Sequence, residues 1–430
     1  MKKVTFRASF SILIAIAILA GLALYIFRYI EKGEEWALYF DASTSSCTYK
    51  LVDRNGVSLA TMDRGGRFYS PDDEVRTSCY HTIGDYAGNV GTGILVNFKR
   101  ELSGYSPITG IREGEDVTLK ITLDAELNKI AYSALAGRSG AVMLVNYKTG
   151  EVPCMVSSPS MDPLNPPETL PDGVYLNRCI SSTFTPGSVF KIVTLTAALE
   201  NIPDLYQRTF TCSGGIEVSG VYVKCSGTHG TQTIEQAFAN SCNCAFGELS
   251  LELGADTLEE YAGRLGLTSQ HTLDKVTTAA GSFTKDTAGS PGLAWSGIGQ
   301  FEDLVCPYSM LRLVSAIAND GKLVEPSLMG TSSKTTDFMT KTVADKLTDM
   351  MNYNVVYHYG KDNFPNLNVC AKTGTAQVGQ GKENHAWFVG FILDEAHPYA
   401  FVVLVENGGS GLTAAGSIAN TVLQAAVNRN

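Results

Sequence analysis

The sequence predicts an α+β sandwich, in which a central antiparallel sheet is flanked by helices and preceded by a smaller β-rich region. Two pairs of strand-like segments form hairpins, at residues 141–156 and 384–406. A long, mostly helical stretch separates these two pairs in the chain. A sheet built from strands on both sides of a helical region must pack against those helices, because each element buries one apolar face.

The N-terminal segment predicts a membrane anchor. Residues 10–27 are nearly all apolar, and at 1.5 Å per residue they would span roughly 27 Å, close to the thickness of a bilayer core. Lys2, Lys3 and Arg7 precede this run, which favours a cytoplasmic N-terminus. We therefore predict a cytoplasmic tail at 1–9 and a transmembrane helix at 10–28; a cleaved signal peptide is the alternative. Either interpretation places the rest of the chain outside the cytoplasm.

Two further regions follow the anchor. Residues 36–115 are rich in glycine and turn signals and carry no catalytic pattern. From Asp116 the pattern changes: residues 117–123 alternate as in a strand, and Asp124 caps a predicted helix that ends at Leu135. We predict a non-catalytic domain at 29–115 and a catalytic domain at 116–430, which ends in a helix at 416–427.

Length and charge narrow the possible functions. A chain of 430 residues has room for two or three domains. The formal net charge is -10, which argues against a nucleic-acid partner, because binding to a phosphate backbone requires a basic surface.

The most informative stretch is Ser188-Val189-Phe190-Lys191, which follows Thr185-Pro186-Gly187. Proline is favoured at the start of a helix, and residues three apart share one helical face. The Lys191 amine would then lie beside the Ser188 hydroxyl. Serine becomes a nucleophile only with a base beside it, and lysine can be that base if burial lowers its pKa.

Two later patches could complete such a site. Ser241-Cys242-Asn243 offers a second hydroxyl and an amide within the helical region 234–253. Lys372-Thr373-Gly374-Thr375 follows an apolar run and precedes a predicted strand. A glycine there lets another backbone approach closely, and a strand edge can bind an extended peptide.

The cysteines leave two states open. The sequence has ten, without paired C-x-x-C modules, so we predict no metal site and no cofactor. Cys212 and Cys225 could form a disulfide across a glycine-rich loop, or could be reduced and buried. A bridge between Cys242 and Cys244 is not expected, because near neighbours on one helix point apart.

Taken together, the motifs resemble those of penicillin-binding proteins, the serine D,D-transpeptidases of bacterial peptidoglycan. S-x-x-K at 188–191, S-x-N at 241–243 and K-T-G at 372–374 occur in the family's order. Flanking stretches at 297–300, 318–321 and 385–391 are similar as well. The anchor and the short second region resemble those of class B, monofunctional members, and particularly the short penicillin-binding protein A group.

The resemblance implies a role for each motif residue. Ser188 would attack the substrate carbonyl, Lys191 would take the proton, and Ser241 with Lys372 would relay a proton to the leaving group. Asn243 would orient Lys191 and the donor peptide. Thr373, Gly374 and Thr375 would bind substrate, and the backbone N–H groups of Ser188 and Thr375 would form the oxyanion hole.

The resemblance also implies substrates, inhibitors and partners. Stem peptides of peptidoglycan would be the substrates, β-lactams the covalent inhibitors, and a membrane glycosyltransferase of the SEDS family the partner. A serine β-lactamase, a β-lactam sensor and a scaffold subunit are the alternatives. Class A β-lactamases carry an E-x-x-L-N pattern after S-x-N, and this chain lacks that pattern there.

Overall fold

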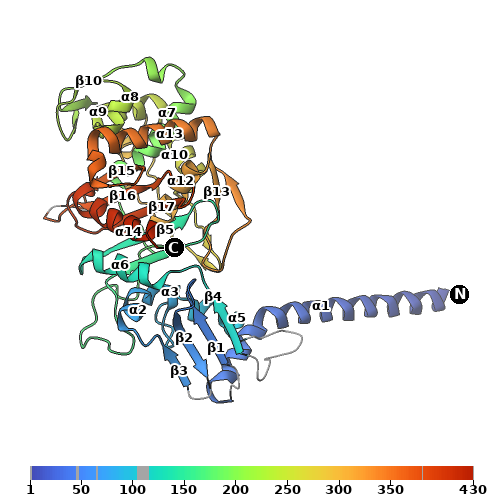
Figure 1. Cartoon of the computed structure of the whole chain (residues 1–430). Helices are drawn as coiled ribbons and strands as arrows, with labels where there is room; N and C mark the ends of the chain where they lie inside the picture. The colour runs from blue at the N-terminus through green and yellow to red at the C-terminus, as the bar shows by residue number, and fades with distance from the viewer. Residues whose placement is uncertain (1, 45–47, 64–65, 104–115, 380, 430) are drawn as a thin grey trace.

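The central sheet contains five antiparallel strands, and both predicted hairpins are confirmed (Figure 1). The computed structural model describes residues 2–44, 48–63, 66–103, 116–379 and 381–429. The strand order is β15-β16-β17-β5-β6, which leaves β15 at an edge. The strands are β5 Gly140–Asn146, β6 Cys154–Ser158, β15 Val369–Ala376, β16 His385–Ile392 and β17 Tyr399–Val405.

Helices cover both faces of this sheet, as the predicted α+β sandwich requires. Alternate residues of β5 divide between two hydrophobic clusters: Val142 packs with helices α6 (Ala125–Leu135) and α14 (Ser417–Val427). Met143 packs with α12 (Pro307–Ala318) in the other cluster. Because both faces are covered, the strands are apolar at nearly every position instead of alternating with polar residues.

Besides the central sheet and the helices that cover it, the catalytic unit is mostly helical with short strands, and the helices between residues 191 and 264 form its upper part in Figure 1. Its further helices are η1 Gly187–Phe190, α7 Lys191–Asn201, η2 Leu205–Gln207, α8 Ile234–Ala239, α9 Asn243–Leu253, α10 Ala255–Arg264, α11 Pro291–Ser296, α13 Lys341–Tyr353, η3 Asn354–Gly360, η4 Lys361–Asn363 and η5 Gly411–Gly416. Its short strands are β7 Phe210–Cys212, β8 Gly215–Val218, β9 Val221–Lys224, β10 Gly230–Gln232, β11 Thr272–Leu273, β12 Val276–Thr277, β13 Lys322–Val324 and β14 Thr335–Asp337.

Two expectations for this upper part need correction. Residues 212–233, which include the expected glycine-rich loop between Cys212 and Cys225, contain the short hairpin β8–β9 and the strand β10, which pairs with β7. The helical region 234–253 is broken into α8 and α9 at residues 240–242. Ser241 adopts a positive φ of 52° at the break, a conformation that a continuing α-helix cannot contain.

The N-terminal region forms a second, four-stranded sheet below the catalytic unit in Figure 1. Its order is β3-β2-β1-β4, and α2 to α5 pack beside it. The elements are β1 Thr48–Val52, β2 Ser58–Asp63, β3 Gly66–Tyr69, β4 Asp116–Lys120, α2 Asp73–Ser78, α3 Tyr80–Ile83, α4 Ile94–Asn97 and α5 Lys99–Ser103. A turn follows β1, within the region where the sequence shows turn signals: the Asp53 carboxylate accepts hydrogen bonds from the N–H groups of Asn55 and Val57, each at 2.8 Å.

The predicted domain boundary at 115/116 divides this sheet. That boundary places β4 in the catalytic domain, but β4 pairs in parallel with β1, from Thr48 opposite Asp116 to Val52 opposite Lys120. The alternation at 117–123 identified a strand correctly; it could not identify the partner, because pairing is decided by the open edge of β1 in space. Residues 104–115, just before the boundary, lie outside the described residues.

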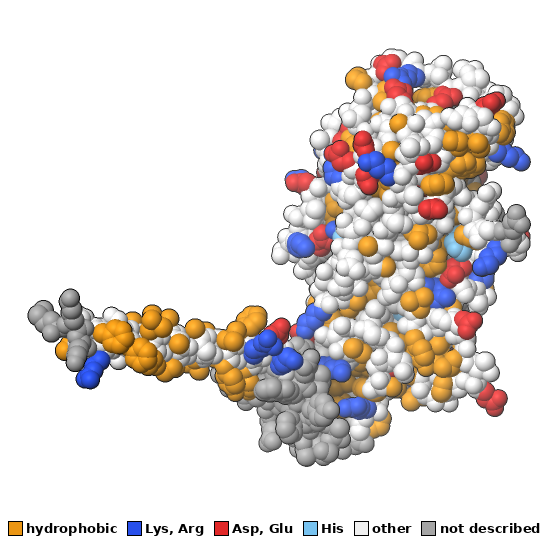
Figure 2. All heavy atoms as spheres, turned by 180° about the vertical axis from the view of Figure 1, so that it is seen from behind, with side chains coloured by type: hydrophobic (Ala, Val, Ile, Leu, Met, Phe, Trp, Pro, Cys, Tyr) orange, Lys and Arg blue, Asp and Glu red, His pale blue; other side chains and the backbone are white. Residues whose placement is uncertain are grey.

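The N-terminal helix α1 (Lys2–Thr44) is longer than the predicted span 10–28 and projects away from the folded part (Figure 1). Residues 36–44 are thus helical, where the sequence predicts the start of a β-rich region with turns. The physical reason is that residues 29–44 contain many good helix formers such as Glu, Ala and Leu. The segment 4–32 is long and apolar enough to cross a membrane, and no residue of its most apolar stretch is buried. Figure 2 shows hydrophobic side chains along this helix. Its exposed apolar residues include Phe6, Phe10, Leu13, Ile16, Leu19, Leu24 and Phe27.

Candidate active site

Ser188 and Lys191 lie together at the start of α7, as their spacing predicts. The segment begins with a 3₁₀ turn, Gly187–Phe190, and continues as an α-helix from Lys191. Ser188 is partly exposed, whereas the Lys191 side chain is fully buried. Lys191 Nζ lies 3.1 Å from Ser188 Oγ. A direct proton transfer between the two groups needs no further movement of the chain.

The oxygens around the Lys191 amine are all neutral. Besides Ser188 Oγ, Nζ contacts the Ser241 carbonyl at 2.6 Å, Ser241 Oγ at 3.1 Å and Asn243 Oδ1 at 2.7 Å. Burial disfavours the charged form of an amine that has no carboxylate to compensate it. Burial accordingly lowers the pKa of Lys191 to about 7. A substantial fraction of this lysine is then neutral near neutral pH and can act as a base.

A second buried lysine extends the hydrogen-bonded chain. Lys372 Nζ donates to Ser241 Oγ at 3.0 Å and to the carbonyl of Thr373 at 3.1 Å. The Ser241 hydroxyl therefore bridges the two amines of Lys191 and Lys372. Burial, followed by repulsion from Lys191, holds the pKa of Lys372 well below its usual value. The arrangement connects Ser188 to Lys372 through adjacent proton-carrying groups.

Asn243 is fixed from two sides. Its Oδ1 accepts from Lys191, and its Nδ2 donates to the carbonyl oxygen of Lys224 at 2.9 Å. The break between α8 and α9 directs Ser241 toward both lysines, while Asn243 begins the next helix. The left-handed backbone of Ser241 carries a cost of the order of 1 kcal/mol for a non-glycine residue, as is often observed at functional sites.

The edge strand β15 borders the site and carries Thr373, Gly374 and Thr375. Gly374 allows close approach: a Cβ there would lie 2.9 Å from the Pro186 carbonyl oxygen and 3.0 Å from Val189. From the opposite side, a Cβ on Gly187 would lie 2.8 Å from the Thr375 carbonyl oxygen. The two glycines therefore let the backbone before Ser188 pack directly against the strand, as the sequence predicts for the K-T-G glycine.

A cavity of about 470 Å³ opens over these groups. The predicted residues Ser188, Ser241, Asn243, Thr373 and Thr375 line it, while Lys191 and Lys372 are buried beneath. Ile298 and Gln300 of the flanking stretch 297–300 line it as well. The motifs assign no site role to the remaining lining residues, which are Lys224, Cys225, Ser226, Asn240, Trp295, His358, Gln377 and Asn384. Of the described residues that line this cavity, none is an aspartate or a glutamate.

Tyr359 is a further residue that sequence reasoning missed. Its buried hydroxyl accepts from the Thr373 N–H at 3.1 Å and from Thr373 Oγ1 at 3.2 Å, so it fixes the backbone of β15 beside the cavity. Tyr359 lies in the π-helical turn Asn354–Gly360. No spacing or motif marks it, because it reaches β15 only through the tertiary fold. Trp387, in the flanking stretch 385–391, is buried and donates to the Thr185 carbonyl at 3.0 Å.

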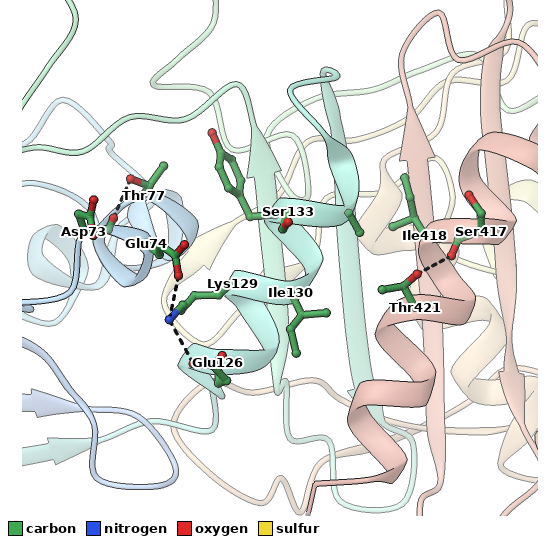
Figure 3. Close-up of a pocket in the computed structure, with 12 residues that line it drawn as sticks. Asp73, Glu74, Thr77, Glu126, Lys129, Ile130, Ser133, Ser417, Ile418 and Thr421 are labelled. Carbon is green, nitrogen blue, oxygen red and sulfur yellow. Dashed lines mark hydrogen bonds and ion pairs between the residues drawn. The ribbon is translucent and has the colours of Figure 1, made fainter.

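A second cavity, of about 660 Å³, lies between α2, α6 and α14 (Figure 3). Lys129 lies in it and forms ion pairs with Asp72, Glu74 and Glu126 at 3.1, 3.0 and 3.3 Å. These carboxylates keep the lysine charged, so Lys129 cannot act as a neutral amine base in this groove. A separate thiol cluster offers metal ligands: the ligand atoms of Cys212, Cys225, His229 and Cys242 all lie within 4.8 Å of one another.

Comparisons with known proteins agree with this geometry. Residues 140–424 match the penicillin binding protein transpeptidase domain. The peptidoglycan D,D-transpeptidase PbpA of Mycobacterium tuberculosis is 30% identical over 330 residues, 67% of each chain. The stage V sporulation protein D of Bacillus subtilis is 29% identical over 340 residues, 72% of this chain and 52% of that protein.

A solved structure of penicillin-binding protein A from M. tuberculosis, a ceftriaxone acyl-enzyme complex, has a TM-score of 0.75 and 26% identity to this chain. The match covers 89% of this chain and 99% of that one. The three motifs, the cavity that they share and these similarities lead to one conclusion: the chain belongs to the penicillin-binding protein transpeptidase family and resembles its class B members.

Proposed function

We propose that this protein crosslinks peptidoglycan stem peptides as a membrane-anchored serine D,D-transpeptidase, through an acyl-enzyme on Ser188. The observation that carries the proposal is the 3.1 Å distance between the Ser188 hydroxyl and a buried Lys191 amine whose pKa is lowered to about 7. A hydroxyl beside a partly neutral amine is an activated nucleophile. The relatives named as peptidoglycan D,D-transpeptidases support the same reaction.

Acylation would begin with attack of Ser188 Oγ on the carbonyl carbon of the penultimate D-alanine. The hydroxyl proton passes to Lys191, and the carbonyl oxygen becomes an oxyanion that accepts from the backbone N–H groups of Ser188 and Thr375. One such donor contributes about 2.7–4 kcal/mol to lowering the barrier. The C–N bond then breaks. The departing D-alanine nitrogen takes a proton from the Ser241 hydroxyl, which Lys372 or Lys191 resupplies.

A second stem peptide would resolve the acyl-enzyme. Its amine attacks the ester carbonyl, loses a proton to Lys191, and forms the new amide as Ser188 Oγ leaves and is reprotonated. The edge of β15 is open to an extended peptide by strand addition, and the Thr373 and Thr375 hydroxyls would hold the terminal carboxylate. A β-lactam would acylate Ser188 by the same steps, as the acyl-enzyme structure of the mycobacterial relative illustrates.

The cavity lining separates this proposal from a β-lactamase. Rapid hydrolysis of an acyl-enzyme needs a base that activates water, and in class A β-lactamases a glutamate has this role. The described lining residues here contain no carboxylate. We therefore expect the penicillin adduct to persist for many minutes.

The anchor and the N-terminal sheet would hold the site above the membrane. We propose a tail at 1–9, a span at 10–28, and a catalytic unit on the outer side, with the region 29–115 and β4 forming the pedestal between them. By resemblance to class B enzymes, a SEDS-family glycosyltransferase would be the partner. If the chain serves only as a scaffold for that partner, cells with Ser188→Ala should keep their crosslinking and shape. If the chain acts as an enzyme, both should be impaired.

The central test is intact-mass spectrometry of the purified chain after treatment with penicillin G. We expect one adduct, located on Ser188 by peptide mapping and stable for many minutes, and no adduct on the Ser188→Ala variant. Ser226 lines the same cavity, so Ser226→Ala serves as the matched control and should still acquire the adduct. Turnover within seconds, or an adduct that persists in Ser188→Ala, would reject the proposal.

A further inference from the structure

Four potential metal ligands converge behind the S-x-N turn, outside the residues that the proposed reaction uses. Cys212 ends β7, Cys225 follows β9, His229 precedes β10, and Cys242 caps α9. The three cysteines are buried, and the histidine is half-buried. The ligand atoms of all four lie within 4.8 Å of one another. Buried thiols that only pack in a core need no histidine among them. The combination of three thiols with one imidazole therefore suggests that the cluster binds a metal ion.

The spacing of these atoms suits a tetrahedral ion. Cys225 Sγ lies 3.6 Å from His229 Nδ1 and 4.0 Å from Cys242 Sγ. Zinc bonds of about 2.3 Å to sulfur and about 2.0–2.1 Å to nitrogen give tetrahedral edges of roughly 3.8 Å between sulfurs and roughly 3.6 Å between sulfur and nitrogen. The observed separations therefore need only small adjustments to enclose one ion.

We propose that Cys212, Cys225, His229 and Cys242 bind one structural zinc ion. Thiolate and imidazole ligands in a closed, four-coordinate set are typical of zinc and poorly suited to magnesium or calcium. Binding would displace the three thiol protons to solvent, with no change in oxidation state. The Asn243 N–H donates to Cys225 Sγ at 3.2 Å, an outer hydrogen bond of the kind that stabilises a thiolate ligand.

Disulfide formation is the competing state, because an exported chain meets oxidising conditions. Cys212 Sγ lies 3.3 Å from Cys244 Sγ, and Cys225 Sγ lies 4.0 Å from Cys242 Sγ, so two bridges are geometrically conceivable. Both separations exceed the S–S bond length of about 2.05 Å. Two bridges would also leave His229 without a role, whereas a zinc ion uses the imidazole and three of the four clustered sulfurs.

The ion would hold the two chain segments that position Asn243. Cys242 lies between Ser241 and Asn243, which both contact the Lys191 amine. Cys225 follows Lys224, whose carbonyl oxygen accepts from Asn243 Nδ2. A single ion bound by Cys225 and Cys242 therefore links both sides of the Asn243 side chain. Its ligands would be positioning residues, because they contact neither the Ser188 hydroxyl nor the Lys191 amine in the described hydrogen bonds.

Metal analysis of the full-length chain, purified in detergent without chelators, tests this inference. We expect one zinc per chain, and after exchange with Co²⁺ the absorption bands of a tetrahedral, thiolate-bound ion. His229→Gln is the preferred variant, because a half-buried position tolerates substitution; it should weaken zinc retention by at least about 100-fold, more than loss of an outer-shell partner costs. Cys242→Ser should act in the same direction. Cys154→Ala, a buried cysteine on β6, is the matched control and should keep the zinc.

The acylation rate provides a second readout. Chelator-treated protein should react with a fluorescent penicillin up to about 100-fold more slowly, because small misplacements of a catalytic group have effects of this size, and zinc should restore the rate. Ser188→Ala should bind zinc normally but not acylate, so failure of the proposed reaction and failure of the metal site are distinguishable. Zinc-free protein with two disulfides by mass, or reduced protein that does not take up added zinc, would overturn the inference.

Discussion

Two lysines lie next to two different cavities, Lys191 beneath the candidate active-site cavity and Lys129 in the groove of Figure 3, and the surroundings give the two amines opposite character. The buried Lys191 amine contacts four neutral oxygens, and its pKa falls to about 7. In the groove of Figure 3, Lys129 lies among three carboxylates, and hydrogen bonds led by Glu74 raise its pKa. Carboxylates and water keep an amine protonated; their exclusion makes it a base.

Removing each amine in turn should produce the largest difference between the two cavities. Lys191→Gln keeps a polar side chain but cannot accept the Ser188 proton, so the rate of acylation by penicillin should fall by about 10²–10⁴-fold. Lys129→Gln should leave that rate within about twofold of the original. Stopped-flow or gel-based labelling with a fluorescent penicillin measures both. Equal losses in the two variants would contradict the assignment of Lys191 as the base.

The comparison can be sharpened by giving Lys191 the type of partner that Lys129 has. Asn243→Asp places a carboxylate at the atom that now lies 2.7 Å from Lys191 Nζ. Acylation of the original protein should rise as pH increases through about 7, because the neutral amine is the active form. The new negative charge favours the protonated amine and should move that rise upward by about 1–3 pH units.

The control for this change is Asn243→Ala, which removes the amide without adding charge. It should lower the acylation rate at every pH and leave the midpoint of the pH profile near its original position. A profile that shifts equally in both variants would show that the added charge is not the cause.

The smallest expected effects concern stability, and they have opposite signs. Lys191→Met removes a buried amine and should raise the free energy of unfolding by about 1–2 kcal/mol at pH 7. The folded pKa of Lys191 lies below its unfolded value, so the unfolded chain binds more protons between about pH 7 and the usual lysine value of 10.5. The gain should therefore be largest below about pH 7 and should disappear toward pH 10.5.

Lys129→Met should instead lower stability, because it removes ion pairs. The partners are partly exposed, with side chains 41%, 71% and 50% accessible, so the loss should be below about 1 kcal/mol. Denaturant unfolding of the two variants between about pH 7 and pH 10.5 compares their free energies of unfolding. Destabilisation by Lys191→Met would indicate that the lysine contributes more through its packing than it costs by burial.

Much of this architecture could be predicted from local pattern. The hairpins at 141–156 and 384–406 have strand-like apolar runs joined by turn residues, and both are present. The Asp124 cap is also present: its carboxylate accepts from the Leu127 N–H at 2.9 Å. Each of these features is determined within a few residues, which is why short stretches of sequence were sufficient.

Features that depend on distant partners were missed. The partner of β4 and the hydrogen bonds from Thr373 to Tyr359 follow from the assembled molecule, and the extent of α1 follows from the helix formers at residues 29–44. The cysteines show the same limit. The prediction of no metal site rested on the missing C-x-x-C pairs, whereas the four candidate ligands are brought together from residues 212 to 242 by short paired strands and a helix start.

The sequence alone determined which reactive groups this protein carries and which of them are local neighbours, since Ser188 and Lys191 are three residues apart on one helical face. Only the tertiary structure decided what those groups can do. It buried Lys191 completely and surrounded its amine with oxygens from residues 50 and 52 positions away. The physical reason is that covalent order sets spacing along a chain, whereas a pKa depends on the water and charge that the folded chain admits.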